Sequence, residues 1–220
     1  MARQRICKTL NNSHNFDFMK KFKVDDLIDK LQSDVRQLIA AAEHLRQADP
    51  VKLSYPPEEG SWSVAQCLEH LNAYNRYYLP QIDKNISHIS KELNAWFIPG
   101  FWGERFTKMM APNNVYEVKS KMKAPKGYRP ERAVNVQAVF DEFLAHQARL
   151  LKLLDVSRKR NLNTIRIPIT ISKFIKLKLG DTFRFLIAHE QRHMIQARNA
   201  LKKLGYTTDK FPVILEAVPQ

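Results

Sequence analysis

The sequence has few of the features that place a chain outside the ordinary globular proteins. Only two cysteines, Cys7 and Cys67, occur among 220 residues, which excludes a disulfide scaffold and favours a reducing compartment. Six glycines and eleven prolines exclude collagen-like and low-complexity chains. The longest uncharged apolar run, residues 93–103, is far shorter than the ~20 residues of a membrane span. The amino end lacks the apolar stretch of a secretory signal. We therefore expect a cytoplasmic protein with no membrane partner.

Acidic residues are scarce in three segments, and this distribution explains most of the formal net charge of +14. The basic segments are residues 1–23, 119–132 and 146–178. They contain no interleaved aromatic pattern, helix-turn-helix signature or Cys/His finger. We interpret them as a solvated basic surface rather than a phosphate-binding groove, so nucleic acid is not the expected partner.

Apolar residues recur at helical spacing in four long segments. Ser63 and Gln66 form a capping box that predicts the start of the second helix, and Pro80 within that helix predicts a kink or a break. Pro130 suits the first turn of the third helix, and Gly205 ends the fourth. The four predicted helices cover residues 24–48, a segment starting at residue 63, about 131–156 and 180–204.

The segments between these helices predict the overall architecture. Residues 96–130 lose the periodicity and are expected to be a long loop, while residues 164–179 alternate like a strand. Pro168 in the latter favours an isolated extended segment or a short hairpin over a sheet. The fold class is therefore all-α, a four-helix bundle with long connections between helices two and three and between three and four. We expect a basic amino-terminal arm over 1–23, the bundle over 24–208 and a carboxy-terminal tail over 209–220.

Three of the seven histidines form a candidate metal site. His189 and His193 are four residues apart, so they lie on one face of the fourth helix and can share one divalent ion. His70 lies on the second helix on a stripe with Tyr74. Burying three neutral imidazoles without a metal or acceptors would cost ~1–3 kcal/mol for each unmade hydrogen bond. We predict these three as ligands; three unrelated histidines are the alternative.

Three nitrogen ligands leave a divalent ion with an open position, where a thiol or water loses its proton more easily. Availability favours zinc, and the affinity order favours nickel. Gln196 and Glu190 are candidates to orient the ligand rings, and Tyr74 could face the open position. Surface or core roles are equally open for Glu190 and Tyr74.

Aromatic residues are concentrated in the segment after the second helix. We hypothesise that Trp96, Phe101 or Trp102 acts as a lid over the site and restricts the entry of water. The alternative is that these rings close one end of the bundle.

The stretch WSVAQCLEHL, with Trp62, Ser63 and His70, is followed far downstream by LGDTFRFLIAHEQRHMIQA, with His189 and His193. This combination resembles the DinB/YfiT-like superfamily over about residues 25–205. The resemblance implies a four-helix bundle in which one histidine of the second helix and the pair of the last helix bind zinc, nickel or a similar ion. Characterised members include thiol-dependent S-transferases and a maleylpyruvate isomerase, and others are described as metal-dependent hydrolases.

The resemblance implies a metal-dependent enzyme, a thiol S-transferase or a hydrolase, with a small-molecule substrate and a low-molecular-weight thiol as co-substrate. A second interpretation is a non-catalytic interaction module with a vestigial or structural metal site, whose basic surface binds an acidic partner or nucleic acid. A third is a helical scaffold without metal. A homodimer is compatible with a bundle, although no heptad seam identifies an interface.

Overall fold

A computed structural model describes residues 20–87, 93–114, 117–118, 122–170, 172–212 and 214–215. Most of the expected amino-terminal arm, with Cys7 and His14, lies outside the described residues, as do His88 and the last part of the expected tail. The domain boundaries that we expect from the sequence stay predictions.

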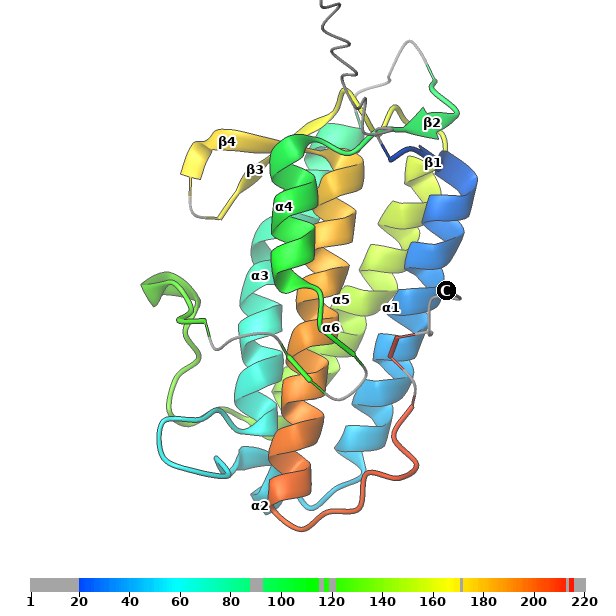
Figure 1. The fold of residues 1–220 in the computed structure, drawn as a ribbon. Helices are drawn as coiled ribbons and strands as arrows, with labels where there is room; N and C mark the ends of the chain where they lie inside the picture. Colours follow the sequence, from blue (N-terminus) through cyan, green and yellow to red (C-terminus); the bar gives the residue numbers. More distant parts are fainter. Residues whose placement is uncertain are drawn as a thin grey trace, which may run out of the picture.

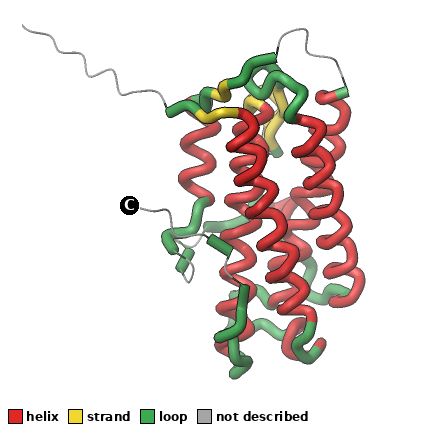
Figure 2. Tube along the Cα trace, turned by 90° about the vertical axis from the view of Figure 1, so that its right-hand side faces the viewer, coloured by secondary structure: helices red, strands yellow, loops and turns green. Residues whose placement is uncertain are grey.

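Four long helices lie side by side along one axis and confirm the predicted helical bundle (Figure 1). The same four rods are visible in the view turned by 90° (Figure 2). Helix α3 packs against α5 and α6, and α1 packs against the other faces of α5 and α6. The bundle helices are α1 (Val24–Arg46), α3 (Val64–Ile86), α5 (Val136–Ser157) and α6 (Leu179–Lys203).

Helix α6 is the most deeply buried of the four, because it contacts α1, α3 and a short helix outside the bundle. That short helix, α4 (Phe101–Met110), and a still shorter one, α2 (Pro50–Ser54), flank the bundle. A single 3₁₀ turn, η1 (Lys126–Tyr128), precedes α5. Among the described residues, no helix combines the length and apolar character of a membrane span.

Two small antiparallel ribbons lie at one end of the bundle (Figure 1). Strand β1 (Phe22–Lys23) pairs with β2 (Trp96–Phe97), so the last residues of the expected arm form part of the fold. Strands β3 (Arg166–Ile169) and β4 (Ser172–Lys178) form a hairpin, with a register shift between Pro168 and Ile169. Of the two forms that we expected for residues 164–179, an isolated extended segment or a short hairpin, the structure shows the hairpin.

The structure corrects our expectation that residues 96–130 form only a loop, because α4 lies within them. Gly100 donates its N–H to the buried carboxylate of Asp181 over 2.8 Å, at the start of α4. A Cβ on Gly103 would lie 2.0 Å from Cγ of Asp181, so only glycine permits this approach of α4 to α6. Arg184 of α6 bonds to Glu104 at 2.6 Å. The helix has only ten residues, Pro99 and Gly100 directly precede it and Gly103 lies inside it, so its sequence carries the signals of a loop.

Helix α5 begins later than predicted, at Val136 rather than near Pro130. The side chain of Gln66 donates to the carbonyl of Glu131 over 3.0 Å, which holds that backbone in a loop. Asn135 then caps the helix through the N–H of Ala138, 3.0 Å away.

Helix α3 runs through Pro80 without the break that we allowed for. Pro80 lies on the exposed side of the helix, where solvent can replace the backbone hydrogen bond that proline cannot make.

Candidate metal site

The three predicted ligands come from two neighbouring helices whose local sequences fix their positions. The capping box of Ser63 and Gln66 starts α3, and His70 follows about two turns later. His189 and His193 lie one turn apart on the face of α6 that packs against α3. All three are buried, with 2%, 3% and 8% of their surfaces exposed.

The imidazoles of these residues converge on one point. One ring nitrogen from each of His70, His189 and His193 lies within 4.8 Å of the other two. The Nε2 atoms of His70 and His189 are 3.1 Å apart, and the ring centroids are separated by 4.5 to 5.0 Å. Zn–N bonds of about 2.0–2.1 Å fit nitrogens at such separations around one ion.

Hydrogen bonds on the outer side of the cluster orient two of the rings. Nδ1 of His70 is 2.6 Å from the carbonyl oxygen of Tyr128, which can only accept, so we assign the ring proton to that nitrogen. Nδ1 of His193 donates in the same way to Oε1 of Gln196 at 3.0 Å. Nε2 of His70 and Nε2 of His193 then carry lone pairs. Nδ1 of His189 is buried and has no hydrogen-bond partner within the described part of the chain.

Burial keeps the three imidazoles neutral. It lowers the pKa of His70 to about 4, although the bond to the Tyr128 carbonyl opposes this shift. Burial also lowers the pKa values of His189 and His193 well below the usual range, with further lowering from neighbouring histidines and Arg192. Neutral rings are the form that binds a metal, and the site offers them without competition from protons near pH 7.

Aromatic rings surround the histidines. Trp62 lies 4.9 Å from the ring of His70 and stacks on His193 at 5.7 Å. Tyr74 lies 4.9 Å from His70 and 4.4 Å from His189, which agrees with a position beside the site. Phe185 stacks on His189 at 6.0 Å. These walls exclude water from the nitrogens, which strengthens electrostatic interactions in the site.

From the sequence alone we assigned no role at the site to Trp62 or to Tyr128. Trp62 directly precedes the capping box, and from the sequence it was noted only as part of the WSVAQCLEHL stretch. Tyr128 comes from an aperiodic stretch rich in lysine and proline, and its contribution is a backbone carbonyl that no residue pattern reveals. The tryptophan in the WSVAQCLEHL motif was the one available signal.

The structure separates the two candidates for orienting the rings. Gln196 contacts His193 as described above, whereas Glu190 points away from the histidines. Its Oε1 accepts hydrogen bonds from the side chains of Asn75 and Gln147, each at 2.9 Å. Glu190 is fully buried, so the surface position that we held open is wrong, and its carboxylate joins three helices instead.

The three lid candidates are not among the residues that surround the histidines. Trp96 lies in β2 opposite Lys23, and Phe101 and Trp102 are 76% and 51% exposed on α4. Trp102 reaches the site only through a series of rings: it stacks on Phe106, which contacts Phe185. The lid stays a hypothesis, and the arrangement agrees better with rings that cover one end of the bundle.

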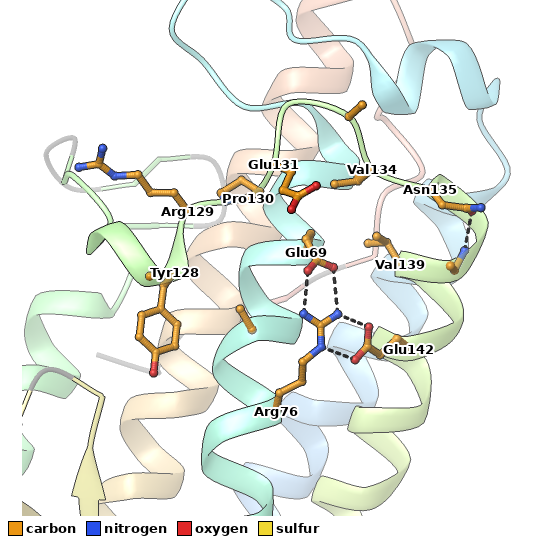
Figure 3. Close-up of a pocket in the computed structure, with 14 residues that line it drawn as sticks. Glu69, Arg76, Tyr128, Arg129, Pro130, Glu131, Val134, Asn135, Val139 and Glu142 are labelled. Carbon is orange, nitrogen blue, oxygen red and sulfur yellow. Dashed lines mark hydrogen bonds and ion pairs between the residues drawn. The ribbon is translucent and has the colours of Figure 1, made fainter.

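Tyr128 also lines a pocket of about 430 Å³ (Figure 3). Arg76 lies between Glu69 and Glu142 in this pocket and forms ion pairs with both (Figure 3). These bonds hold the pKa of Glu142 below its usual range. Since Tyr128 lines the pocket and also accepts the hydrogen bond of His70, the pocket and the histidine cluster share one wall.

The comparison with known families is compatible with metal binding by the three histidines. Residues 35–197, more than half of the chain, match the DinB superfamily. No curated protein and no solved structure matches the chain. The matched region contains His70, His189 and His193, and the chain therefore belongs to the DinB superfamily.

Proposed function

We propose that His70, His189 and His193 bind one divalent cation, zinc or nickel, at an open site. The observation that carries the proposal is the convergence of three buried ring nitrogens within 4.8 Å of one another. Two of the rings have outer hydrogen bonds that leave Nε2 free as a ligand. Of the three converging nitrogens only that of His189 can carry a proton, so the neutral cluster forms one N–H···N bond at most, whereas a cation pairs with all three lone pairs.

The chain's own residues hold the ligands and exclude solvent. The Tyr128 carbonyl and Gln196 fix the tautomers of two ligands, as outer partners of metal-bound histidines commonly do. Trp62 and Tyr74 form apolar walls beside the rings. A divalent ion bound here supplies a Lewis acid that lowers the pKa of a coordinated thiol or water.

The reaction that we propose is thiol S-transfer or hydrolysis on a small molecule, with a low-molecular-weight thiol as co-substrate for the transfer. Membership of the superfamily and the all-histidine ligand set support both reactions. The aromatic surroundings of the histidines favour a substrate with an apolar group beside the reacting atom.

Elemental analysis of the purified protein tests the metal. We expect about one zinc or nickel per chain in the wild type and a strong loss in His70→Ala. His146→Ala is the matched control, because His146 on α5 is largely buried and contacts Asn72 and Glu142 rather than the cluster. Equal metal content in wild type and His70→Ala would remove His70 from the site.

A second experiment separates the two reactions. Metal-loaded protein is assayed with glutathione and an aryl halide, and in parallel with a nitrophenyl ester in the absence of thiol. Metal-dependent product in the first assay supports S-transfer, and in the second hydrolysis. Retained metal with no turnover in either assay would favour the non-catalytic interaction module.

A further inference from the structure

The β3–β4 hairpin has two chemically different faces. Its inner face carries Ile167, Ile169 and Leu177, which are buried against the bundle. Arg166 and Lys176 on the other positions are exposed. Residues 164–180 contain four basic residues and no aspartate or glutamate. The exposed face of this hairpin is therefore positive.

The hairpin also presents an aromatic side chain to solvent. Phe174 is 98% exposed, and its neighbour Ile175 is 38% exposed. Because side chains alternate along a strand, Phe174 shares a face with Lys176. A single exposed apolar residue is ordinary in a soluble protein, but here Phe101 and Trp102 at the start of α4 are exposed as well.

These features gather at one end of the bundle, which we call the hairpin end: β1, β2, the β3–β4 hairpin and the first turn of α4 (Figure 1). Lys21, directly before β1, and Lys23 within it are exposed as well. Acidic residues at the start of α1 are partly neutralised there, because Arg158 forms ion pairs with Asp25 and Asp29.

We propose that the hairpin end docks onto an anionic phospholipid surface. Exposed phenylalanine and tryptophan suit the boundary between headgroups and acyl chains, and lysine and arginine suit the anionic headgroups. Contact of this kind needs no spanning helix, and it departs from our expectation of no membrane partner, which rested on the lack of spanning and exported segments. Ile175, on the opposite strand face and 38% exposed, adds aliphatic surface that suits acyl chains and offers nothing for base stacking. The proposal does not depend on the metal site.

Cosedimentation with vesicles tests the docking. The wild type is expected to bind vesicles of equimolar phosphatidylcholine and phosphatidylserine, with affinity that falls as salt rises, and not vesicles of phosphatidylcholine alone. Phe174→Ser should weaken binding about tenfold through the lost apolar contact. Lys176→Gln should weaken it about fivefold, as expected for one basic group near an anionic surface.

Tyr55→Ser is the matched control, because Tyr55 is 65% exposed next to α2, at the opposite end of the bundle (Figure 1). Its binding should equal that of the wild type. Circular dichroism checks that each variant is folded, which we expect since none of the substituted side chains is buried. The proposal is overturned if the wild type does not bind anionic vesicles, or if Phe174→Ser and Tyr55→Ser bind them equally well. It is also overturned if Phe174→Ser weakens binding to an oligonucleotide and not to lipid.

Discussion

Consecutive residues of α6 belong to two buried polar clusters that differ in their chemistry. His189 shares its cluster with His70 and His193, and the nitrogens that face one another there include two that carry lone pairs. Glu190 shares its cluster with Asn75 and Gln147, where two amide groups donate to one carboxylate oxygen. The first cluster can supply at most one donor, the Nε2–H of His189, to its lone pairs, whereas in the second cluster two donors meet one acceptor oxygen.

Burial acts on both clusters and in both cases favours the neutral form. It lowers the pKa of His70 to about 4 and raises the pKa of Glu190 to about 7, against the effect of its two amide bonds. The converging imidazole nitrogens can form only one N–H···N bond, between His189 and His70, and a cation can pair with all three of them. The carboxyl of Glu190 already has partners from α3 and α5, so it joins helices. The two clusters thus differ in how many donors surround the central acceptor atoms: two amide groups donate to one oxygen of Glu190, whereas three imidazole nitrogens share one N–H at most, and burial is common to both.

The largest effect should come from removing a residue of the first cluster. His189→Ala is expected to lower metal affinity by more than the ~10–100-fold typical of outer partners, because it removes a ligand. Titration against a chromophoric chelator measures this affinity. Glu190→Gln, one residue away, should change it only a few-fold. Similar losses in both variants would mean that the two clusters are not distinct.

A smaller effect should come from the outer hydrogen bond of His193. Gln196→Ala removes the acceptor for Nδ1 of His193 and should weaken metal binding ~10–100-fold. Gln196→Glu retains an acceptor oxygen at the same place and should restore most of the affinity. Unchanged affinity in Gln196→Ala would show that the tautomer of His193 is fixed in another way.

A substitution in the second cluster should change the free energy of unfolding by an amount that depends on pH. The pKa of Glu190 is raised from 4.5 to about 7 in the folded protein, so folding retains a proton that the unfolded chain releases. The stabilising contribution is complete below the unfolded pKa and is lost as pH rises through the folded pKa. Glu190→Gln cannot titrate, and its amide can donate to the buried oxygens Asn75 Oδ1 and Gln147 Oε1, which lack partners among the described residues.

Metal-free Glu190→Gln should therefore be more stable than the wild type by about 1–3 kcal/mol at about pH 8, with the difference shrinking toward about pH 5. Urea unfolding at both pH values measures the free energy of unfolding. Glu43→Gln, a substitution at a carboxylate outside both clusters, serves as the control for the loss of one negative charge. A difference between Glu190→Gln and wild type that does not vary with pH would contradict the prediction.

The sequence predicts the first cluster better than the second for a physical reason. The spacing of His189 and His193 fixes their common face, and the capping box places His70 in the facing helix. Glu190 has no such signal, because its amide partners come from helices whose relative rotation is set only by packing. The helix around Gly103 was missed for the same reason, since it is held by contacts with a distant element, those of Asp181 and Arg184 on α6. A regular helix or an i, i+4 pair can be predicted from residues that are close in the sequence. Complementary contacts between distant elements cannot.

The smallest effect on stability is expected for an exposed ion pair between α3 and α5, two of the helices that Glu190 also joins. Asp83 of α3 and Arg149 of α5 form an ion pair at 2.8 Å, with side chains 57% and 43% exposed. Water already solvates both charges, so Asp83→Asn should change the free energy of unfolding by less than about 0.5 kcal/mol, and high salt should remove even that. Urea unfolding at low and high salt measures it. A loss as large as the effect of Glu190→Gln would show that charge between α3 and α5, rather than burial of the carboxyl, sets the energetics of the second cluster.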